Sequence, residues 1–116
     1  MASSNLSFAR WDVILTPFPF TDKRNEKRRP ALVISSADFN KANEQIIAVM
    51  ITGAAKSAWP DDRPIEDLGA AGLPKKCVVR WKVFTLPNEL VIKKLGQIAI
   101  AERGALTAKI AELFLA

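Results

Sequence analysis

The segment KRNEKRRPALVIS (residues 23–35) joins a highly charged stretch to a run of apolar residues. Its first seven residues hold five cations and one carboxylate. Pro30 then opens a run whose side chains suit burial on both faces of a sheet. Residues 21–29 have no apolar side chain to bury, so we expect a mobile surface loop there. The sequence predicts a cationic loop hinged on a rigid strand.

Outward from this segment the chain shows several short strands separated by long connections. A first strand, residues 11–16, should end near Thr16, because Pro17 and Pro19 cannot continue a central strand. Residues 46–52 are rich in β-branched side chains, which predicts a second strand buried on both faces. The remaining expectations are a helical turn or loop at 36–45, long connections over 53–74 with at most one short strand near 64–66, a helical turn within 88–96 and a last strand at 97–101.

Residues 77–86 alternate in a way that predicts a further strand. One face would carry Cys77, Val79, Trp81, Val83 and Thr85, and the other Val78, Arg80, Lys82 and Phe84. Trp81 is expected in the core beside its apolar neighbours. Arg80 and Lys82 are either the solvated side of a half-buried strand or contacts to an anionic ligand.

The last segment, residues 102–116, has the pattern of a closing helix. Leu106, Ile110, Leu113 and Phe114 recur at helical spacing and form one apolar stripe. Burying each of these side chains is worth about 1.5 to 3 kcal/mol, so we expect the helix to dock on the sheet. The stripe is interpreted as core or as a dimer surface.

The totals fit one domain, residues 1–116, with 49% apolar residues and 25% charged residues. The predicted class is mainly β, a small bent antiparallel sheet or partly open β-barrel with a C-terminal α-helix. The net charge of +5 makes a polyanion a reasonable partner only if the cations cluster, because many basic proteins bind nothing anionic.

Cysteine and histidine usage excludes several classes of site. Cys77 is the single cysteine and the chain has no histidine, so neither an internal disulfide nor a Cys/His metal site is expected. The first ten residues lack the pattern of a secretory signal, and no apolar run approaches the roughly 20 residues of a membrane helix. We expect a soluble protein of the reducing cytosol, with no membrane partner and Cys77 as a small buried apolar residue.

Five separated segments carry a resemblance to a known family, in matching order over nearly the whole chain. They are WDVILTPFPFTD (11–22), KRRPALVIS (27–35), VMITG (49–53), GLPKKCVVRWKVFTL (72–86) and LGQIAI (95–100). Together they resemble the MazF/PemK toxins of bacterial type II toxin–antitoxin systems, with PFPFTD closest to the PemK-like branch.

The resemblance implies an SH3-like, CcdB/PemK-type partly open barrel that forms a homodimer in the bacterial cytoplasm. It also implies an endoribonuclease that cuts single-stranded RNA without a metal or another cofactor and is silenced by a cognate antitoxin.

The resemblance also implies which residues act. Arg29, directly before the buried strand, contributes to catalysis, Thr52 at the end of the next strand is its partner, and Arg80 is a further arginine implicated in the PemK branch. That branch often has an aspartate two residues after this arginine, where this chain has Lys82. Glu26, the nearest carboxylate in the cationic loop, is the remaining candidate for a general base.

The chemistry of these side chains suits RNA. Arg29 can clamp a phosphate with its planar donors, and the Thr52 hydroxyl can bind a phosphate oxygen or orient the ribose 2′-OH. Trp59 lies in a polar loop, where it can stack on a base or meet a partner protein. The remaining expected RNA contacts are Lys23, Arg24, Lys27, Arg28 and Lys82.

Other interpretations stay open at this stage. Without the resemblance, the cationic loop is more often a solvated tip than a site. The acidic segment DDRPIED (61–67) is interpreted as ordinary loop solvation rather than as a surface that repels RNA. The alternatives to a ribonuclease are a CcdB-like inhibitor of a protein target such as DNA gyrase and an inactive RNA-binding relative, which the missing acid after Arg80 keeps open.

Overall fold

The computed structural model describes residues 7–18, 27–56 and 59–115. In chain order the elements are β1 (Asp12–Phe18), β2 (Lys27–Val33), α1 (Ala37–Asn43), β3 (Gln45–Gly53), the 3-10 helix η2 (Ala54–Lys56), β4 (Arg63–Pro64), α2 (Leu68–Ala71), β5 (Cys77–Pro87), the 3-10 helix η3 (Asn88–Leu90), β6 (Lys93–Gln97) and α3 (Ile100–Leu115).

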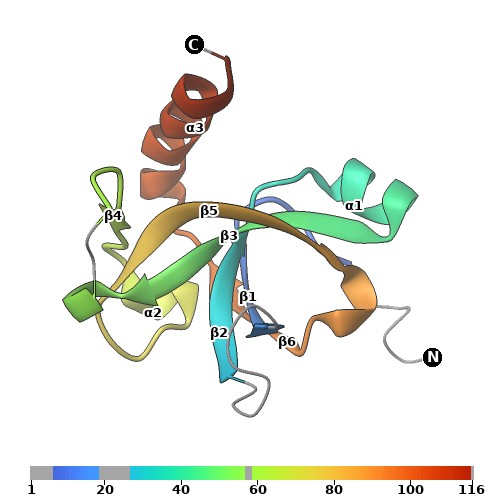
Figure 1. Cartoon of the computed structure of the whole chain (residues 1–116), viewed down its shortest axis with the longest axis horizontal. Helices are drawn as coiled ribbons and strands as arrows, with labels where there is room; N and C mark the ends of the chain where they lie inside the picture. The colour runs from blue at the N-terminus through green and yellow to red at the C-terminus, as the bar shows by residue number, and fades with distance from the viewer. Residues whose placement is uncertain (1–6, 19–26, 57–58, 116) are drawn as a thin grey trace.

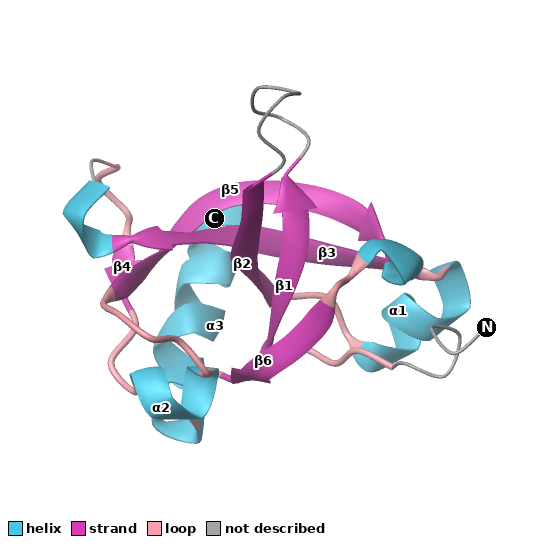
Figure 2. Cartoon of the chain, turned by 90° about the horizontal axis from the view of Figure 1, so that it is seen from below, coloured by secondary structure: helices cyan, strands magenta, loops and turns pink. Residues whose placement is uncertain are grey.

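The strands form one antiparallel sheet with the order β4-β5-β3-β2-β1-β6. The sheet curls strongly, so that β3 and β5 cross over the strands β1, β2 and β6 (Figures 1 and 2). In the part of the chain that the structure describes, no ladder joins the edge strands β4 and β6. This confirms the predicted mainly β fold, a partly open barrel with a C-terminal helix.

Both faces of the sheet are buried, each by its own core. The first core consists of Val13, Leu32, Val49, Ile51, Ile65, Ala71, Leu73, Cys77, Val79, Ile98 and Leu106. The second core consists of Phe8, Ile14, Ala31, Val33, Ile46, Ala48, Leu86 and Val91. Neighbouring residues of β2 alternate between the two cores, because successive side chains of a strand point to opposite faces. The expectation of a strand buried on both faces is confirmed.

Strands β1 and β2 both extend beyond the predicted limits. β1 pairs with β6 only as far as Leu15, so its continuation through Pro17 pairs with β2 alone. A strand that pairs on one edge only tolerates proline, because no neighbour on the other edge needs the backbone N–H that proline lacks. β2 begins at Lys27 rather than at Pro30. Residues 27–29 therefore belong to the sheet and not to a loop, while residues 19–26 lie outside the described part of the chain.

The segment after β5 differs from the prediction. The last strand is β6, not residues 97–101, and α3 already begins at Ile100. The sequence pattern failed here because β6 is an edge strand with two exposed lysines instead of an apolar alternation. The helix α2 was also not predicted. It precedes Gly72, which has a φ of 71° and ends the helix in the left-handed conformation that glycine adopts freely.

The apolar stripe of α3 is only partly buried. Leu106 is 1% exposed and belongs to the first core, whereas Leu113 is 40% and Phe114 is 56% exposed. The prediction that the whole stripe docks on the sheet is therefore wrong. The helix runs away from the sheet toward its C-terminal end (Figure 1), which agrees with the exposure of Leu113 and Phe114. That this end forms a dimer surface stays a prediction.

The alternation along β5 holds only in its first half. Cys77 and Val79 lie in the first core and Trp81 packs against it, but Val83 is 41% exposed. Phe84, assigned to the solvated face, packs against the second core. The reason is the long curved pairing with β3, in which Met50 pairs with Arg80 and the adjacent Val49 with Val83. This irregularity accompanies the passage of β5 from one core to the other.

We predict opposite effects of two glycine-to-alanine substitutions. At Gly96, an added Cβ would lie 2.3 Å from the carbonyl oxygen of Ala70, so Gly96→Ala should lower the free energy of unfolding by about 1 to 3 kcal/mol. At Gly104, inside α3, an added Cβ meets nothing within 4 Å. Gly104→Ala should raise this free energy by about 0.5 to 1 kcal/mol. Urea unfolding measures both, and a Gly96→Ala protein as stable as the parent would contradict the packing of α2 against β6.

Candidate functional site

The pairing of β3 with its neighbours places the predicted site residues on one face of the sheet. Met50 of β3 pairs with Ala31 of β2 on one side and with Arg80 of β5 on the other. Directly opposed residues share a face, as do residues two apart on one strand. Thr52 therefore lies on the same face as Arg80, at the end of β3.

Arg29 extends this face along β2. Arg29 lies two residues before Ala31 on β2 and Thr52 lies two residues after Met50 on β3, so each residue continues the face of that pair. The ladder between β2 and β3 ends at Ala31, where β2 leaves β3 (Figure 1). Arg29 and Thr52 thus lie on the same side of the sheet, just beyond the last paired residues of β2 and β3. We call the side chains of Arg29, Met50, Thr52 and Arg80 the Arg29 face.

The two partners on this face differ in how firmly they are held. Thr52 is only 7% exposed, so the surrounding sheet restricts its side chain. Arg29 is half-buried, and its backbone carbonyl accepts a hydrogen bond from the Thr16 hydroxyl at 3.4 Å. Among the described residues, none forms an ion pair with Arg29. Its charge is therefore not neutralised by a neighbouring carboxylate in this part of the chain.

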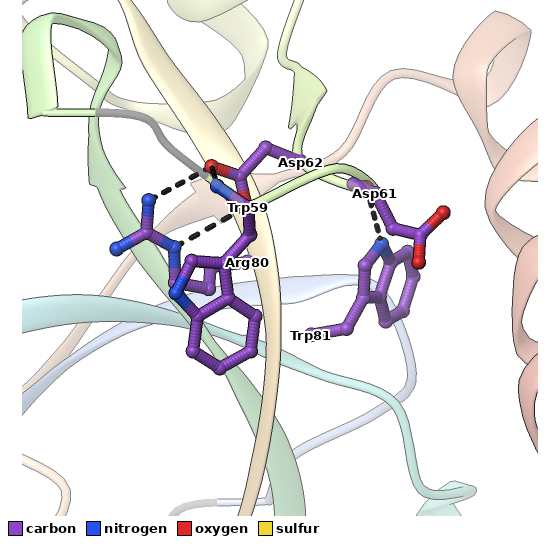
Figure 3. Close-up of polar contacts among 5 residues, drawn as sticks. All are labelled: Trp59, Asp61, Asp62, Arg80 and Trp81. Carbon is purple, nitrogen blue, oxygen red and sulfur yellow. Dashed lines mark hydrogen bonds and ion pairs between the residues drawn. The ribbon is translucent and has the colours of Figure 1, made fainter.

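Arg80 is held by a carboxylate from the loop before β4. Its Nε donates to Asp62 Oδ1 at 3.2 Å and its Nη2 to Asp62 Oδ2 at 2.8 Å, a two-point contact (Figure 3). The hydrogen bond to Asp62 raises the pKa of the Arg80 guanidinium above its ordinary value, with partial burial opposing and the charge of Asp62 adding to the shift. Arg80 is accordingly unsuited to donate a proton, although its charge and planar shape remain available for other roles.

The indole of Trp59 lies against this guanidinium. The Arg80 Cζ atom is 5.2 Å from the ring centroid, within the range of a cation–π interaction, and Trp59 is 45% exposed. Trp81 lies on the other side of β5, where its Nε1 donates to the Asp61 carbonyl at 3.0 Å (Figure 3). Trp81 is partly buried and packs against the first core, which confirms the expected core contact.

Asp62 is the residue that the sequence reasoning missed. The sequence indicates a solvated loop at 61–67, yet the Asp62 side chain is only 4% exposed in its pair with Arg80. Asp61, by contrast, is 51% exposed and pairs with Lys109 of α3 at 3.1 Å. The available signal was the arginine on a half-buried strand, which requires a counter-charge, but the sequence did not indicate which of the four acids supplies it.

The other predicted contacts are placed as follows. Lys23, Arg24 and Glu26 lie outside the described residues, and Lys27 begins β2. Arg28 is exposed and, because it alternates with Arg29, belongs to the opposite face of β2. Lys82 is exposed on β5, two residues after Arg80. Their roles in RNA binding stay predictions.

A cavity elsewhere in the molecule does not include these residues. It has a volume of about 580 Å³ and lies where β6 meets the start of α3. Its cations are engaged within the protein, since Lys94 pairs with Asp12 at 3.5 Å and Arg103 donates to the Ile98 carbonyl at 2.9 Å. We therefore assign the candidate site to the Arg29 face rather than to this cavity.

The described residues hold neither a cluster of metal ligands nor a membrane-spanning helix. Within residues 7–18, 27–56 and 59–115, no group of three or more carboxylate, imidazole or thiol side chains is arranged to hold a metal ion. No described helix has both the length and the apolar character needed to cross a membrane.

The curled antiparallel sheet with a C-terminal helix places the protein in a class of small half-barrel folds. Within that class, the chain belongs to the PemK-like, MazF-like toxin family of type II toxin–antitoxin systems, because the family model matches residues 9–114. This confirms the resemblance seen in the sequence. A comparison with curated protein sequences finds no match.

Solved structures with the same fold include several MazF proteins. The chain aligns with a MazE–MazF structure from Deinococcus radiodurans at a TM-score of 0.72 and 17% identity, covering 96% of this chain and 98% of that one. An endoribonuclease in complex with its cognate antitoxin from a mycobacterial species gives a TM-score of 0.70 at 17% identity, with 91% of each chain covered. The Mycobacterium tuberculosis toxin MazF-mt6 gives 0.69 at 17% identity, covering 89% and 95%.

These comparisons bear on the alternatives left open above. The matching family model describes a MazF-like toxin, and the similar structures are MazF toxins with or without antitoxin. A CcdB-like inhibitor of a protein target such as DNA gyrase is therefore not favoured.

Cys77 lies next to Val78, which pairs with Thr52 of the candidate site. We predict that the Cys77 thiol is nevertheless chemically inert in the folded protein. Burial raises the pKa of this thiol above its ordinary 9.0, with the charge of Lys75 opposing. Iodoacetamide at pH 8 should label the native protein far more slowly than the urea-unfolded protein, as mass spectrometry would measure.

The same shift sets the direction of a pH effect. The folded state retains the thiol proton at a pH where the unfolded state loses it, so the contribution of Cys77 to stability falls as the pH rises past 9.0.

In the labelling experiment, equal rates for native and unfolded protein would contradict the buried position of Cys77.

Proposed function

We propose that the protein is a metal-independent endoribonuclease that cuts single-stranded RNA, acting as the toxin of a toxin–antitoxin pair in the bacterial cytoplasm. The observation that carries this proposal is that Arg29 and Thr52 lie on one side of the sheet, each two residues beyond the last β2–β3 pair, Ala31 with Met50. Membership of a toxin family whose solved relatives include endoribonucleases supports it.

In the proposed reaction the ribose 2′ oxygen attacks the adjacent phosphorus. The bond from this oxygen to phosphorus forms as the bond from phosphorus to the 5′ oxygen breaks, leaving a 2′,3′-cyclic phosphate and a 5′-OH end. A base accepts the 2′ proton, and an acid, either a side chain or a water molecule, donates one to the departing 5′ oxygen. Fixed positive charge stabilises the additional negative charge on the phosphorus oxygens in the transition state.

Arg29 suits the electrostatic part of this reaction. Its guanidinium stays protonated at physiological pH and matches two phosphate oxygens with parallel donors. The charge of Arg80 is instead balanced by Asp62 at 2.8 Å, which makes Arg29 the stronger phosphate clamp of the two. Thr52 offers a hydroxyl that can bind a phosphate oxygen or orient the 2′-OH. Glu26 remains the proposed candidate for the base.

The remaining cations are proposed to bind the RNA backbone. They are Lys23, Arg24, Lys27, Arg28 and Lys82. Each phosphate that they neutralise should add about 0.7 to the slope of log affinity against log salt concentration for a single strand.

Partners of two kinds are proposed. A cognate antitoxin is supported by the similar structures, of which two are toxins solved with their antitoxins. A homodimer is supported by the apolar end of α3, where Leu113 and Phe114 are 40% and 56% exposed. Exposed side chains of this size at one helix end are typical of a surface that another molecule covers.

The first test is the cleavage reaction itself. Incubated with a long single-stranded RNA and a chelator, the wild-type protein should yield defined fragments with 5′-OH ends, and an all-deoxy strand of the same sequence should stay intact. Arg29→Ala should lower the single-turnover cleavage rate about 100- to 1000-fold, because it removes the phosphate clamp.

Arg28→Ala is the matched control, since it removes the same charge from the opposite face of β2. It should reduce the salt dependence of RNA binding by one phosphate contact while the cleavage rate of bound RNA changes little. RNA that binds the wild-type protein and stays whole would overturn the nuclease and support the inactive RNA-binding relative. An Arg29→Ala protein that cuts like the wild type would overturn the role of Arg29.

A second test concerns the homodimer. Leu113→Glu places a charge on the apolar stripe of α3 and should shift the protein toward monomer, as sedimentation velocity would measure. Ala108→Glu, on the exposed opposite side of the same helix, should leave the association unchanged. A dimer that tolerates Leu113→Glu would exclude this end of α3 from the interface.

A further inference from the structure

We propose that Asp62, Arg80 and Trp59 form one preorganised platform on which a base of the bound RNA stacks, with Asp62 as the positioning residue. This inference rests on the proposed function and deepens it. It assigns a role to Asp62, and it separates the work of Arg80, which supports a base, from that of Arg29, which binds the phosphate.

Asp62 organises the platform through both its side chain and its backbone. Its carboxylate takes the two donors of Arg80 at 2.8 and 3.2 Å. Its Oδ2 also accepts from the backbone N–H of Trp59 at 3.3 Å, while its own N–H donates to the Trp59 carbonyl at 3.1 Å. One side chain thus closes the turn that carries the indole and holds the guanidinium beneath it.

The exposure of the three side chains rises from the anchor to the ring. Asp62 is 4%, Arg80 15% and Trp59 45% exposed. The buried members are a bidentate charged pair, whose geometry is specific and strong. The exposed member is a large planar ring held by neighbours that are themselves fixed. Such a ring binds a partner at a low cost in side-chain entropy, because its orientation is already set.

The chemistry of this arrangement favours a base over a phosphate. With its charge balanced by Asp62, Arg80 is a weaker phosphate ligand than an arginine without a carboxylate partner, but its planar group still supports the indole at 5.2 Å. Every base has a π-face, so an exposed tryptophan contributes to single-strand binding without demanding one sequence.

The location agrees with this role. Arg80 belongs to the Arg29 face, and the Trp59 ring lies on the same side of β5 as the Arg80 side chain (Figure 3). An RNA strand that binds Arg29 through a phosphate and continues along the Arg29 face therefore reaches the platform.

The test measures whether Asp62 acts through a stacked base. Single-stranded RNA with 2′-fluoro riboses binds but cannot be cut, and a set of such strands would each carry one abasic site at a different position. For the wild-type protein, one abasic position should weaken affinity about 5- to 150-fold, the range for stacking one base on an aromatic ring.

In Asp62→Asn and in Trp59→Ala, affinity for the intact strand should fall by a similar factor. The same abasic site should then change affinity less than about 2-fold, because these variants have already lost the platform on which the missing base would stack. This non-additivity distinguishes positioning of a base from a general loss of structure. Asp61→Asn, which alters the exposed neighbouring carboxylate, is the matched control and should keep the full abasic effect.

Thermal unfolding of each variant should also be measured, because removing one partner of a buried ion pair destabilises the folded protein. If Asp62→Asn does not fold, Arg80→Lys tests the same contact, because lysine keeps the charge but cannot form the two-point contact. Abasic and Asp62 effects that simply add, or Asp62→Asn binding like the wild type, would overturn the inference.

These outcomes differ from a failure of the proposed function. A wild-type protein that cuts RNA without any abasic dependence overturns the platform alone. A wild-type protein that neither binds nor cuts RNA overturns both.

Discussion

The pairing of β3 between β2 and β5 is the constraint on which the rest of the structure depends. Because alternation and cross-strand register are rigid properties of a sheet, this pairing decides which side chains share a face. It puts Thr52 on the same face as Arg80 of one neighbour and as Arg29 of the other. Residues separated by 51 positions in the chain, Arg29 and Arg80, are thereby presented on one surface.

The same sheet must bury both of its faces, and this explains why the polar site is confined. Most of the Arg29 side of the sheet is covered by the second core, which takes Ala31, Val33 and Ala48. Arg29 and Thr52 lie beyond the last β2–β3 pair, outside this core. The sheet thus holds Thr52 in a fixed position near the strand end that carries Arg29, as a preorganised site would require.

The sequence predicted the strands with apolar patterns and missed the elements that lack one. β3 and β5 were placed to within one residue, because β-branched runs bounded by turns are a strong signal. β6, with two exposed lysines, and α2, with four small or apolar residues, offered no such signal. The pattern predicts the apolar stripe of α3, but a helical stripe indicates only that something covers it. At Leu113 and Phe114 the described part of this chain leaves the stripe exposed.

What the sequence determined by itself is the chemical inventory: no histidine, one cysteine, a cluster of cations and the segments of a toxin family. These are local properties, readable from residue types and their spacing. Which acid neutralises Arg80 was decided only by the tertiary structure. Asp61 and Asp62 are identical in type and adjacent in the chain, yet one is buried against β5 and the other pairs with α3 in solvent. The difference is the direction in which a turn presents two neighbouring side chains, and that direction exists only once β4 and β5 are paired.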